Sequence, residues 1–254
     1  MYIDTHTHLY LKEFDHDRIE MMRRAKENGV QKMYLPAIDS ETHDSMINME
    51  HQFQDACFAM MGLHPCYVKE NFHHELDVAL NWLEKKKFAA IGECGLDFYW
   101  DKTFINQQYE ALQQQIDWAV AFNLPIVLHT RNATRETIEV IRKNKSRGLT
   151  GIFHCFGGTV EEAIDIIELG FYLGIGGVVT YKNSGLDQVL TQIDLQHIVL
   201  ETDAPYLSPV PFRGKRNESS FLVSIAEKIA LLKNTTAEEV GKITTSNAMK
   251  IFRR

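Results

Sequence analysis

Met1-Tyr2-Ile3-Asp4-Thr5-His6-Thr7-His8 opens the chain, and its short apolar run predicts a β-strand over residues 2–5. Two histidines follow this run with a spacing of two. Side chains two residues apart on an extended chain point to the same side, so His6 and His8 are expected to lie together. Two neutral imidazoles at a strand end provide half of a metal site. The other half has to come from the rest of the chain.

Short apolar runs recur along the chain, and helical patterns with apolar residues three or four apart separate them. The further predicted strands cover 32–37, 57–63, 88–93, 125–129, 151–154, 171–175 and 197–203. Eight strand–helix units in 254 residues predict an α/β fold, a (β/α)8 TIM barrel, as a single domain over residues 1–254. An open doubly wound sheet is the alternative, and it is disfavoured because no GxGxxG turn follows any of these strands.

Composition limits the class of protein. The net charge of −7 argues against a general electrostatic nucleic-acid binder, so a polyanionic substrate would need local cations. The four cysteines show no CxxC spacing and are expected to be reduced thiols. No signal peptide is recognised and the apolar runs are too short to span a bilayer, so a cytoplasmic protein without membrane contact is expected.

Polar residues gather where the predicted strands end, which is where barrel enzymes carry their reactive groups. Four histidines and two carboxylates at these ends predict a metal site made by His6, His8, Glu93, His129, His154 and Asp203. Glu93 and Asp203 follow apolar or small residues, where an uncompensated carboxylate would be costly. A bound cation would remove that cost.

Only nitrogen and oxygen donors occur in this set, which suits Zn²⁺, Mn²⁺, iron or nickel and, with water, Mg²⁺. Six ligands exceed the need of one catalytic ion, so two ions bridged by Glu93 are expected. His6 and His8 are assigned to one ion, and His129 with His154 to the other. Asp4 and Glu201 are expected to orient the metal-binding imidazoles without contacting the metal themselves. For Asp4, a purely structural role in the barrel core is nearly as well supported.

Eight sequence pieces resemble the TatD-type metal-dependent deoxyribonucleases of the amidohydrolase-like superfamily. They are DTHTHL (4–9), GLHP (62–65), GECGLD (92–97), LPIVLHTR (124–131), FHCF (153–156), ETDAPY (201–206), PFRGKRNE (211–218) and SNAMKIF (246–252). The resemblance spans the chain and implies the same six metal ligands. It also implies a divalent-metal deoxyribonuclease that hydrolyses DNA phosphodiester bonds, as a 3′–5′ exonuclease on single-stranded DNA.

The mechanism expected from these residues uses two divalent ions, Mg²⁺, Mn²⁺ or Zn²⁺, and a metal-bound hydroxide. Asp203 is expected to act as general base. Phosphate contacts are predicted for His64, Arg131, Arg213 and Lys215. Aromatic residues expected near the same rim either stack a base or pack locally: Phe98, Tyr99, Trp100, Phe156 and Tyr206. The expected partner is single-stranded DNA, and a monomer is favoured.

Three other classes of protein stay open. A phosphomonoesterase would use the same phosphate contacts. A hydrolase of C–N or C–O bonds would share the His-x-His pair, but many such two-metal enzymes bridge their ions with a carboxylated lysine where this chain has Glu93. A barrel that holds metal without turnover is the third class, and the intact Asp203 argues against it.

Overall fold

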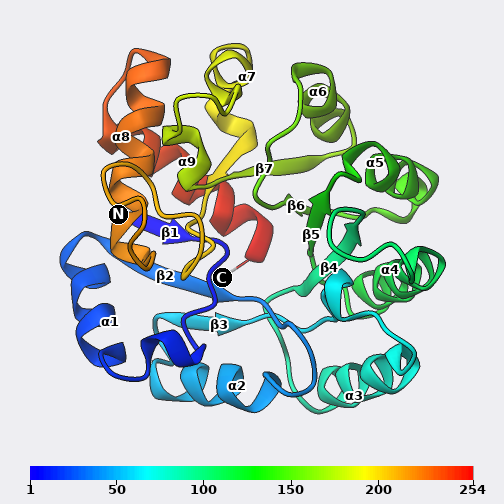
Figure 1. Cartoon of the computed structure of the whole chain (residues 1–254). Helices are drawn as coiled ribbons and strands as arrows, with labels where there is room; N and C mark the ends of the chain where they lie inside the picture. Colours follow the sequence, from blue (N-terminus) through cyan, green and yellow to red (C-terminus); the bar gives the residue numbers. More distant parts are fainter. Residues whose placement is uncertain (254) are drawn as a thin grey trace.

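The computed structural model describes residues 1–253 and has a ring of parallel strands surrounded by helices (Figure 1). Within this range the strands are β1 (Tyr2–Asp4), β2 (Val30–Leu35), β3 (Cys57–Ala59), β4 (Ile91–Asp97), β5 (Ile126–Arg131), β6 (Gly151–Phe153), β7 (Phe171–Ile175) and β8 (Ile198–Leu200). Each predicted strand is found, although several have other bounds.

The strands close into a barrel. They pair in chain order as β1-β2-β3 and β4-β5-β6-β7-β8. Met61, just after β3, bridges to Ile91 of β4, and the amide of Thr5, just after β1, donates to the carbonyl of Leu200 in β8 at 3.0 Å. Because a parallel bridge closes one gap and a backbone hydrogen bond closes the other, the (β/α)8 prediction is confirmed and the open doubly wound sheet is wrong.

Helices alternate with the strands and cover the outside of the ring. In the described residues they are α1 (Arg18–Glu27), α2 (His43–Gln52), α3 (Phe72–Lys85), α4 (Ile105–Ala121), α5 (Thr134–Lys143), α6 (Val160–Glu168), α7 (Leu186–Gln192), α8 (Leu222–Lys233) and α9 (Ala237–Phe252). Thr159 and Glu162 form a capping box at the start of α6. Thr236 caps α9 by accepting from the amide of Glu239.

The inside of the barrel is filled at the end where the strands begin. Its buried apolar side chains are Ile3, Tyr34, Met60, Ala89, Ala90, Val127, Ile152 and Val199, joined by Ala248, Ile251 and Phe252 of α9. The rings of Tyr34 and Phe252 stack with centroids 3.6 Å apart. Because α9 closes this end of the barrel, a site for solutes has to lie at the opposite end, where the strands finish.

Strand β4 differs from its prediction. It covers Ile91–Asp97, not 88–93, so Glu93 lies inside the strand and Asp97 ends it. Gly95 explains the difference: a Cβ there would lie 2.1 Å from the carbonyl oxygen of His129. The glycines of this segment look like strand breakers in the sequence, but they let β4 approach β5 closely and extend the strand.

The ligand-bearing segments after β1 and β8 are also irregular, since these strands end at Asp4 and Leu200, and not at residues 5 and 203 as predicted. Asp203 has a left-handed backbone with φ of 56°, and its amide donates to the carbonyl of His6 at 2.9 Å. An aspartate held in this conformation is strained unless its surroundings fix it. This hydrogen bond between Asp203 and His6 holds the segments after β1 and β8 together.

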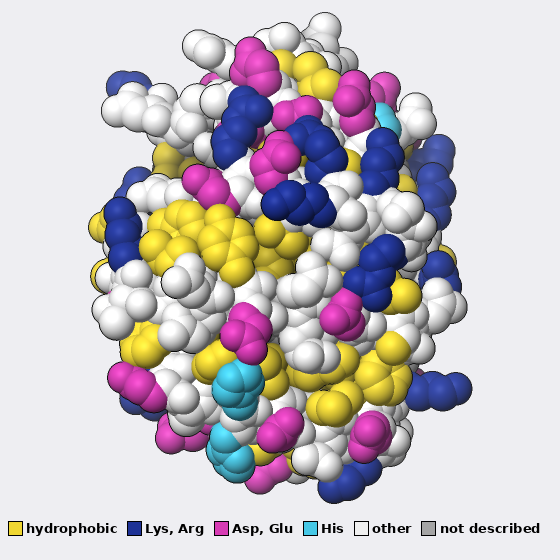
Figure 2. All heavy atoms as spheres, turned by 90° about the vertical axis from the view of Figure 1, so that its right-hand side faces the viewer, with side chains coloured by type: hydrophobic (Ala, Val, Ile, Leu, Met, Phe, Trp, Pro, Cys, Tyr) yellow, Lys and Arg dark blue, Asp and Glu magenta, His cyan; other side chains and the backbone are white. Residues whose placement is uncertain are grey.

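None of the helices within residues 1–253 is long and apolar enough to cross a membrane. On the face shown in Figure 2, side chains of Lys and Arg are mixed with those of Asp and Glu. This face therefore presents no continuous cationic track.

Candidate metal centre

Glu93 lies at the centre of a ring of histidines. Its side chain is 2% exposed. The distances from its carboxylate oxygens to imidazole nitrogens are 2.8 Å for His154, 2.9 Å for His129, 3.0 Å for His6, 3.4 Å for His64 and 3.6 Å for His8. Burial alone would raise the pKa of the Glu93 carboxyl, but His154, His6 and His64 hold this pKa well below its ordinary value. Glu93 is therefore an anion that several rings share.

His6 is the side chain that best tests whether a metal fits. It is fully buried, and neither ring nitrogen makes a hydrogen bond of acceptable geometry with the described residues. Its Nε2 nevertheless lies 3.0 Å from Glu93 and 3.7 Å from Asp203. Burial and the neighbouring His154 lower the pKa of His6, which favours the neutral ring. A buried neutral imidazole aimed at two carboxylates is what a divalent cation requires.

His8 is oriented by a tyrosine that the sequence prediction missed. Tyr10 donates its hydroxyl proton to the carbonyl of Pro36 at 2.6 Å, so its oxygen is left to accept from His8 Nδ1 at 3.1 Å. This fixes the tautomer with the proton on Nδ1. The lone pair of His8 Nε2 then faces Glu93 and Asp203, each at 3.6 Å.

His129 is oriented by Asp97, which also was not predicted as a site residue. One oxygen of Asp97 accepts the amides of Tyr99 and Trp100, and the other lies 2.9 Å from His129 Nε2. In the neutral, metal-binding form of His129 the proton is therefore on Nε2, and Nδ1 faces Glu93 at 2.9 Å. Asp97 is the last residue of the GECGLD piece, so the sequence did contain a signal for it. The prediction missed Asp97 because it ended this strand at residue 93.

His64 differs from these rings in the hydrogen bond that its Nδ1 makes. Its Nδ1 accepts the amide of Cys66 at 3.0 Å, so the proton of the neutral ring is on Nε2. Its Nε2 points toward the centre, 3.4 Å from Glu93. His64 can thus donate a hydrogen bond into the site, whereas the other rings can offer lone pairs.

Two carboxylates were expected behind the ligands. Glu201 lies 3.4 Å from His154 Nδ1 and accepts the amide of Cys155 at 2.5 Å. Asp4 does not contact an imidazole in the described residues. It accepts from the hydroxyls of Thr202 and Ser219, each at 2.6 Å, and from the backbone amide of His6 at 3.4 Å. Asp4 therefore braces the segments that carry His6 and Asp203, not a ring.

Donor atoms of the cluster fall into three groups, each with atoms within 4.8 Å of one another. The groups are His6, His8 and Asp203; His6, Glu93 and His154; and His64, Glu93 and His129. His6 and His154 stack with ring centroids 3.8 Å apart, whereas His129 and His154 are 5.6 Å apart. His154 therefore stacks on His6, while its Nε2 faces the same Glu93 oxygen as Nδ1 of His129.

Two of the three predicted phosphate-binding cations lie over aromatic rings. The guanidinium of Arg131 lies over the Tyr99 ring at 4.0 Å, and that of Arg213 over the Tyr181 ring at 3.9 Å. Lys215 forms no side-chain ion pair within residues 1–253. Arg216, their neighbour in the sequence, pairs with Asp17 at 2.7 Å and is therefore structural.

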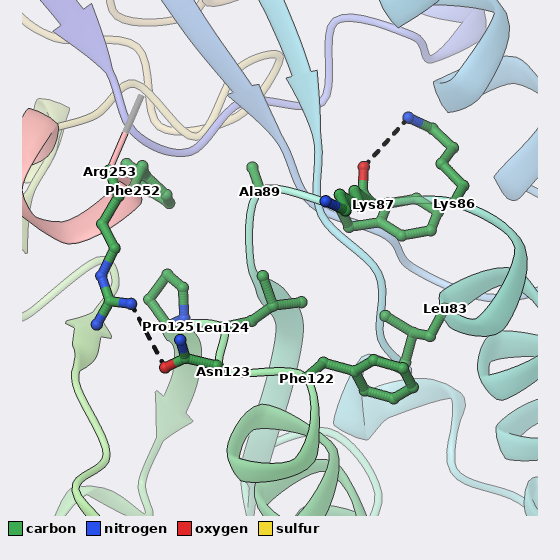
Figure 3. A pocket seen from close by; sticks show the side chains of 11 residues that line it. Leu83, Lys86, Lys87, Ala89, Phe122, Asn123, Leu124, Pro125, Phe252 and Arg253 are labelled. Atoms are coloured by element: carbon green, nitrogen blue, oxygen red, sulfur yellow. Dashed lines mark hydrogen bonds between the residues drawn. The ribbon is translucent and has the colours of Figure 1, made fainter.

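A cavity of about 360 Å³ lies at the opposite end of the barrel (Figure 3). Phe88, Phe122, Phe252 and Arg253 line it, and Arg253 donates to Asn123 at 3.4 Å. No residue of the histidine cluster lines this cavity. This cavity is therefore separate from the candidate metal centre around Glu93.

Replacing Asp97 by asparagine is expected to weaken metal binding by about 10- to 100-fold, because His129 loses the partner that fixes its tautomer. Titration of the metal-free protein with Mn²⁺, followed by electron paramagnetic resonance, measures this directly. Asp117→Asn on α4 is the matched control, because the partners of Asp117, Arg147 and Gln113, lie outside the centre. An Asp97→Asn variant with wild-type Mn²⁺ affinity would remove the role given to Asp97.

Comparisons with known proteins extend over nearly the whole chain. A family model described as TatD related DNase matches residues 3–253. YabD of Bacillus subtilis (strain 168), described as an uncharacterized metal-dependent hydrolase, is 38% identical over 254 residues, which cover 100% of this chain and 99% of the relative. A relative from Erwinia tasmaniensis named 3′-5′ ssDNA/RNA exonuclease TatD is 30% identical over 255 residues, which cover 98% of each.

Among solved structures, the crystal structure of YjjV, a TatD homologue from Escherichia coli K12, superposes with a TM-score of 0.93. It is 27% identical in sequence, and the match covers 100% of this chain and 98% of that chain. All the residues of the histidine cluster lie inside the matched regions.

Proposed function

Because this chain belongs to the TatD-related DNase family of metal-dependent hydrolases, we propose that it hydrolyses DNA phosphodiester bonds. The observation that carries the proposal is the carboxylate of Glu93, which lies within 3.6 Å of a nitrogen of five imidazoles. Such a donor set has the composition of a two-metal hydrolase centre. Residues 1–254 would act as one barrel domain.

The ligands that would hold two divalent ions are His6, His8, Glu93, His129, His154 and Asp203. Glu93 would be the carboxylate that both ions share, since one of its oxygens faces His6 and the other faces His129 and His154. Bound Mg²⁺, Mn²⁺ or Zn²⁺ would supply positive charge that stabilises phosphate oxygens and makes a water molecule more acidic.

Asp203 is the proposed general base. Burial alone would raise its pKa, but His8, His154 and His6 lower it, so the carboxylate is ionised at neutral pH and can accept a proton. Its side chain is 15% exposed, against 2% for Glu93 and 0% for Glu201. Of these three carboxylates, Asp203 is the one that an attacking water can reach.

His64 is proposed to donate its Nε2 proton to a phosphate oxygen, since its Nδ1 is already occupied as an acceptor. Arg131, Arg213 and Lys215 are the proposed contacts to the phosphate backbone. They supply the local cations that an acidic protein needs in order to hold a polyanion.

The substrate is proposed to be single-stranded DNA, degraded from its 3′ end. Support comes from the Erwinia relative, whose name gives a 3′-5′ exonuclease on single-stranded DNA and RNA. RNA is therefore an alternative substrate for the same site. The cytoplasmic location and the monomeric state stay predictions from the sequence.

The test is incubation of metal-loaded protein with oligonucleotides labelled at the 5′ end. We expect a ladder of products shortened from the 3′ end with Mg²⁺ or Mn²⁺, and no products after chelation. Labelled RNA, duplex DNA and a phosphomonoester are tested in parallel. Turnover of the phosphomonoester alone, or cleavage of DNA that resists chelation, would contradict the proposal.

A further inference from the structure

An aromatic platform made by Tyr99, Trp100 and Arg131 lies beyond the ends of β4 and β5. Tyr99 is 52% exposed and Trp100 is 67% exposed, and their ring centroids are 5.0 Å apart at 85°. The guanidinium of Arg131 lies 4.0 Å from the Tyr99 ring centroid and 5.1 Å from that of Trp100. Two large adjacent aromatic rings left open to solvent are uncommon on a protein surface and mark a surface that binds something.

The platform is fixed to the candidate metal centre by a single carboxylate. Asp97 accepts the amides of Tyr99 and Trp100 through Oδ1 and holds His129 through Oδ2. Arg131 belongs to the same arrangement, because Asp97 and Arg131 are register partners across β4 and β5 and the carbonyl of Arg131 accepts the amide of Phe98. The rings are thus held next to the place where a bond would be cleaved.

Charge distinguishes Arg131 from most arginines of the chain. Arg24, Arg142, Arg147 and Arg216 each pair with a carboxylate. Arg131 has no such pairing within residues 1–253. Asp101, the acidic residue that follows Trp100, is already paired with Lys69 at 2.6 Å. The platform therefore presents two aromatic surfaces and an uncompensated cation.

We propose that this platform is a subsite for single-stranded nucleic acid, in which Tyr99 or Trp100 stacks an unpaired base and Arg131 contacts the adjacent phosphate. The proposal rests on the proposed function and specifies how the substrate is selected. Stacking on an aromatic side chain requires a base with a free face, and bases inside a duplex are stacked on their neighbours. The platform would thus select single strands over duplex DNA.

Binding can be measured without turnover. Metal-free wild-type protein is titrated with a single-stranded oligonucleotide while tryptophan fluorescence is recorded. Of the three tryptophans, Trp118 is buried and Trp82 is partly buried, whereas Trp100 is 67% exposed, so stacking on Trp100 is expected to quench the emission. Trp100→Phe should lose the quenching while keeping binding, and duplex DNA should quench less.

Kinetics with the metal-loaded enzyme provide the second readout. Trp100→Ala and Tyr99→Ala are each expected to raise KM for single-stranded DNA by about 10-fold, with a smaller effect on kcat. Phe122→Ala removes an exposed aromatic ring at the opposite end of the barrel (Figure 3) and is the matched control. An oligonucleotide with abasic positions near its 3′ end should bind the wild type as weakly as the normal oligonucleotide binds Trp100→Ala.

Wild-type KM values in both platform variants, together with no quenching in the wild type, would overturn the inference. Failure of the proposed function is a different result, because it would appear as no metal-dependent cleavage of any oligonucleotide by the wild type. Quenching by single-stranded oligonucleotide in a wild type that does not cleave would still support the platform.

Discussion

Glu93→Gln is expected to lower hydrolysis by at least about 1,000-fold, because the centre loses the anion that its imidazoles share. Glutamine keeps the volume of the side chain but replaces one carboxylate oxygen by an uncharged NH₂ group. The imidazole nitrogens that now face the carboxylate lie 2.8–3.6 Å from its oxygens. The variant should therefore also lose at least one metal ion per chain. Elemental analysis of the purified protein and the oligonucleotide assay measure the two effects.

The control for Glu93→Gln has to be another buried carboxylate outside the centre. Glu50 on α2 is 8% exposed, accepts the amide of Ala59 at 2.9 Å and pairs with Lys86 at 2.5 Å. Glu50→Gln is expected to keep both metal ions and cleavage, although its Tm can fall. Full metal content and full activity in Glu93→Gln would exclude Glu93 as the bridge.

Asp203→Asn is expected to lower kcat by about 10²- to 10⁴-fold, the usual contribution of a positioned general base. An amide cannot accept the proton of the attacking water, while its size and most of its packing are kept. Asp203 is also within 3.7 Å of His6 and His8, so its role as base has to be separated from ligation. The metal content of the variant, measured beside kcat, provides that separation.

Asp194→Asn is the matched control for this change. Asp194 caps the short helical turn before β8 by accepting the amide of Gln196, and asparagine can do the same. It should leave both kcat and metal content at wild-type values. If Asp203→Asn keeps its metal and cleaves at the wild-type rate, Asp203 is not the base.

Much of the architecture could be predicted from local sequence. Short apolar runs separated by amphipathic helices predicted eight strands, and the structure has them in order around a closed barrel. The period of side chains along a strand and the length of the repeat decide these features, and both are visible without tertiary information. The bounds were less predictable, since Gly92 and Gly95 look like breakers but allow β4 to reach Asp97.

The histidine cluster was predictable for a related reason. Parallel strands of a barrel end on one side, so polar residues at the strand ends had to meet there. His6, His8, Glu93, His129, His154 and Asp203 do meet, although several lie beyond the strands in irregular backbone. The strand–helix repeat could not predict the distances between the donor atoms or the stacking of His6 on His154.

The sequence by itself determined the closed α/β barrel and the set of residues at its open end, because strand periodicity and chain order act locally. The tertiary structure alone decided which atom of each residue faces the centre. Tyr10 and Asp97 set the tautomers of His8 and His129, and the amide of Cys66 makes His64 a donor. Hydrogen-bond partners brought together by folding determine these protonation sites, so no spacing in the chain could have given them.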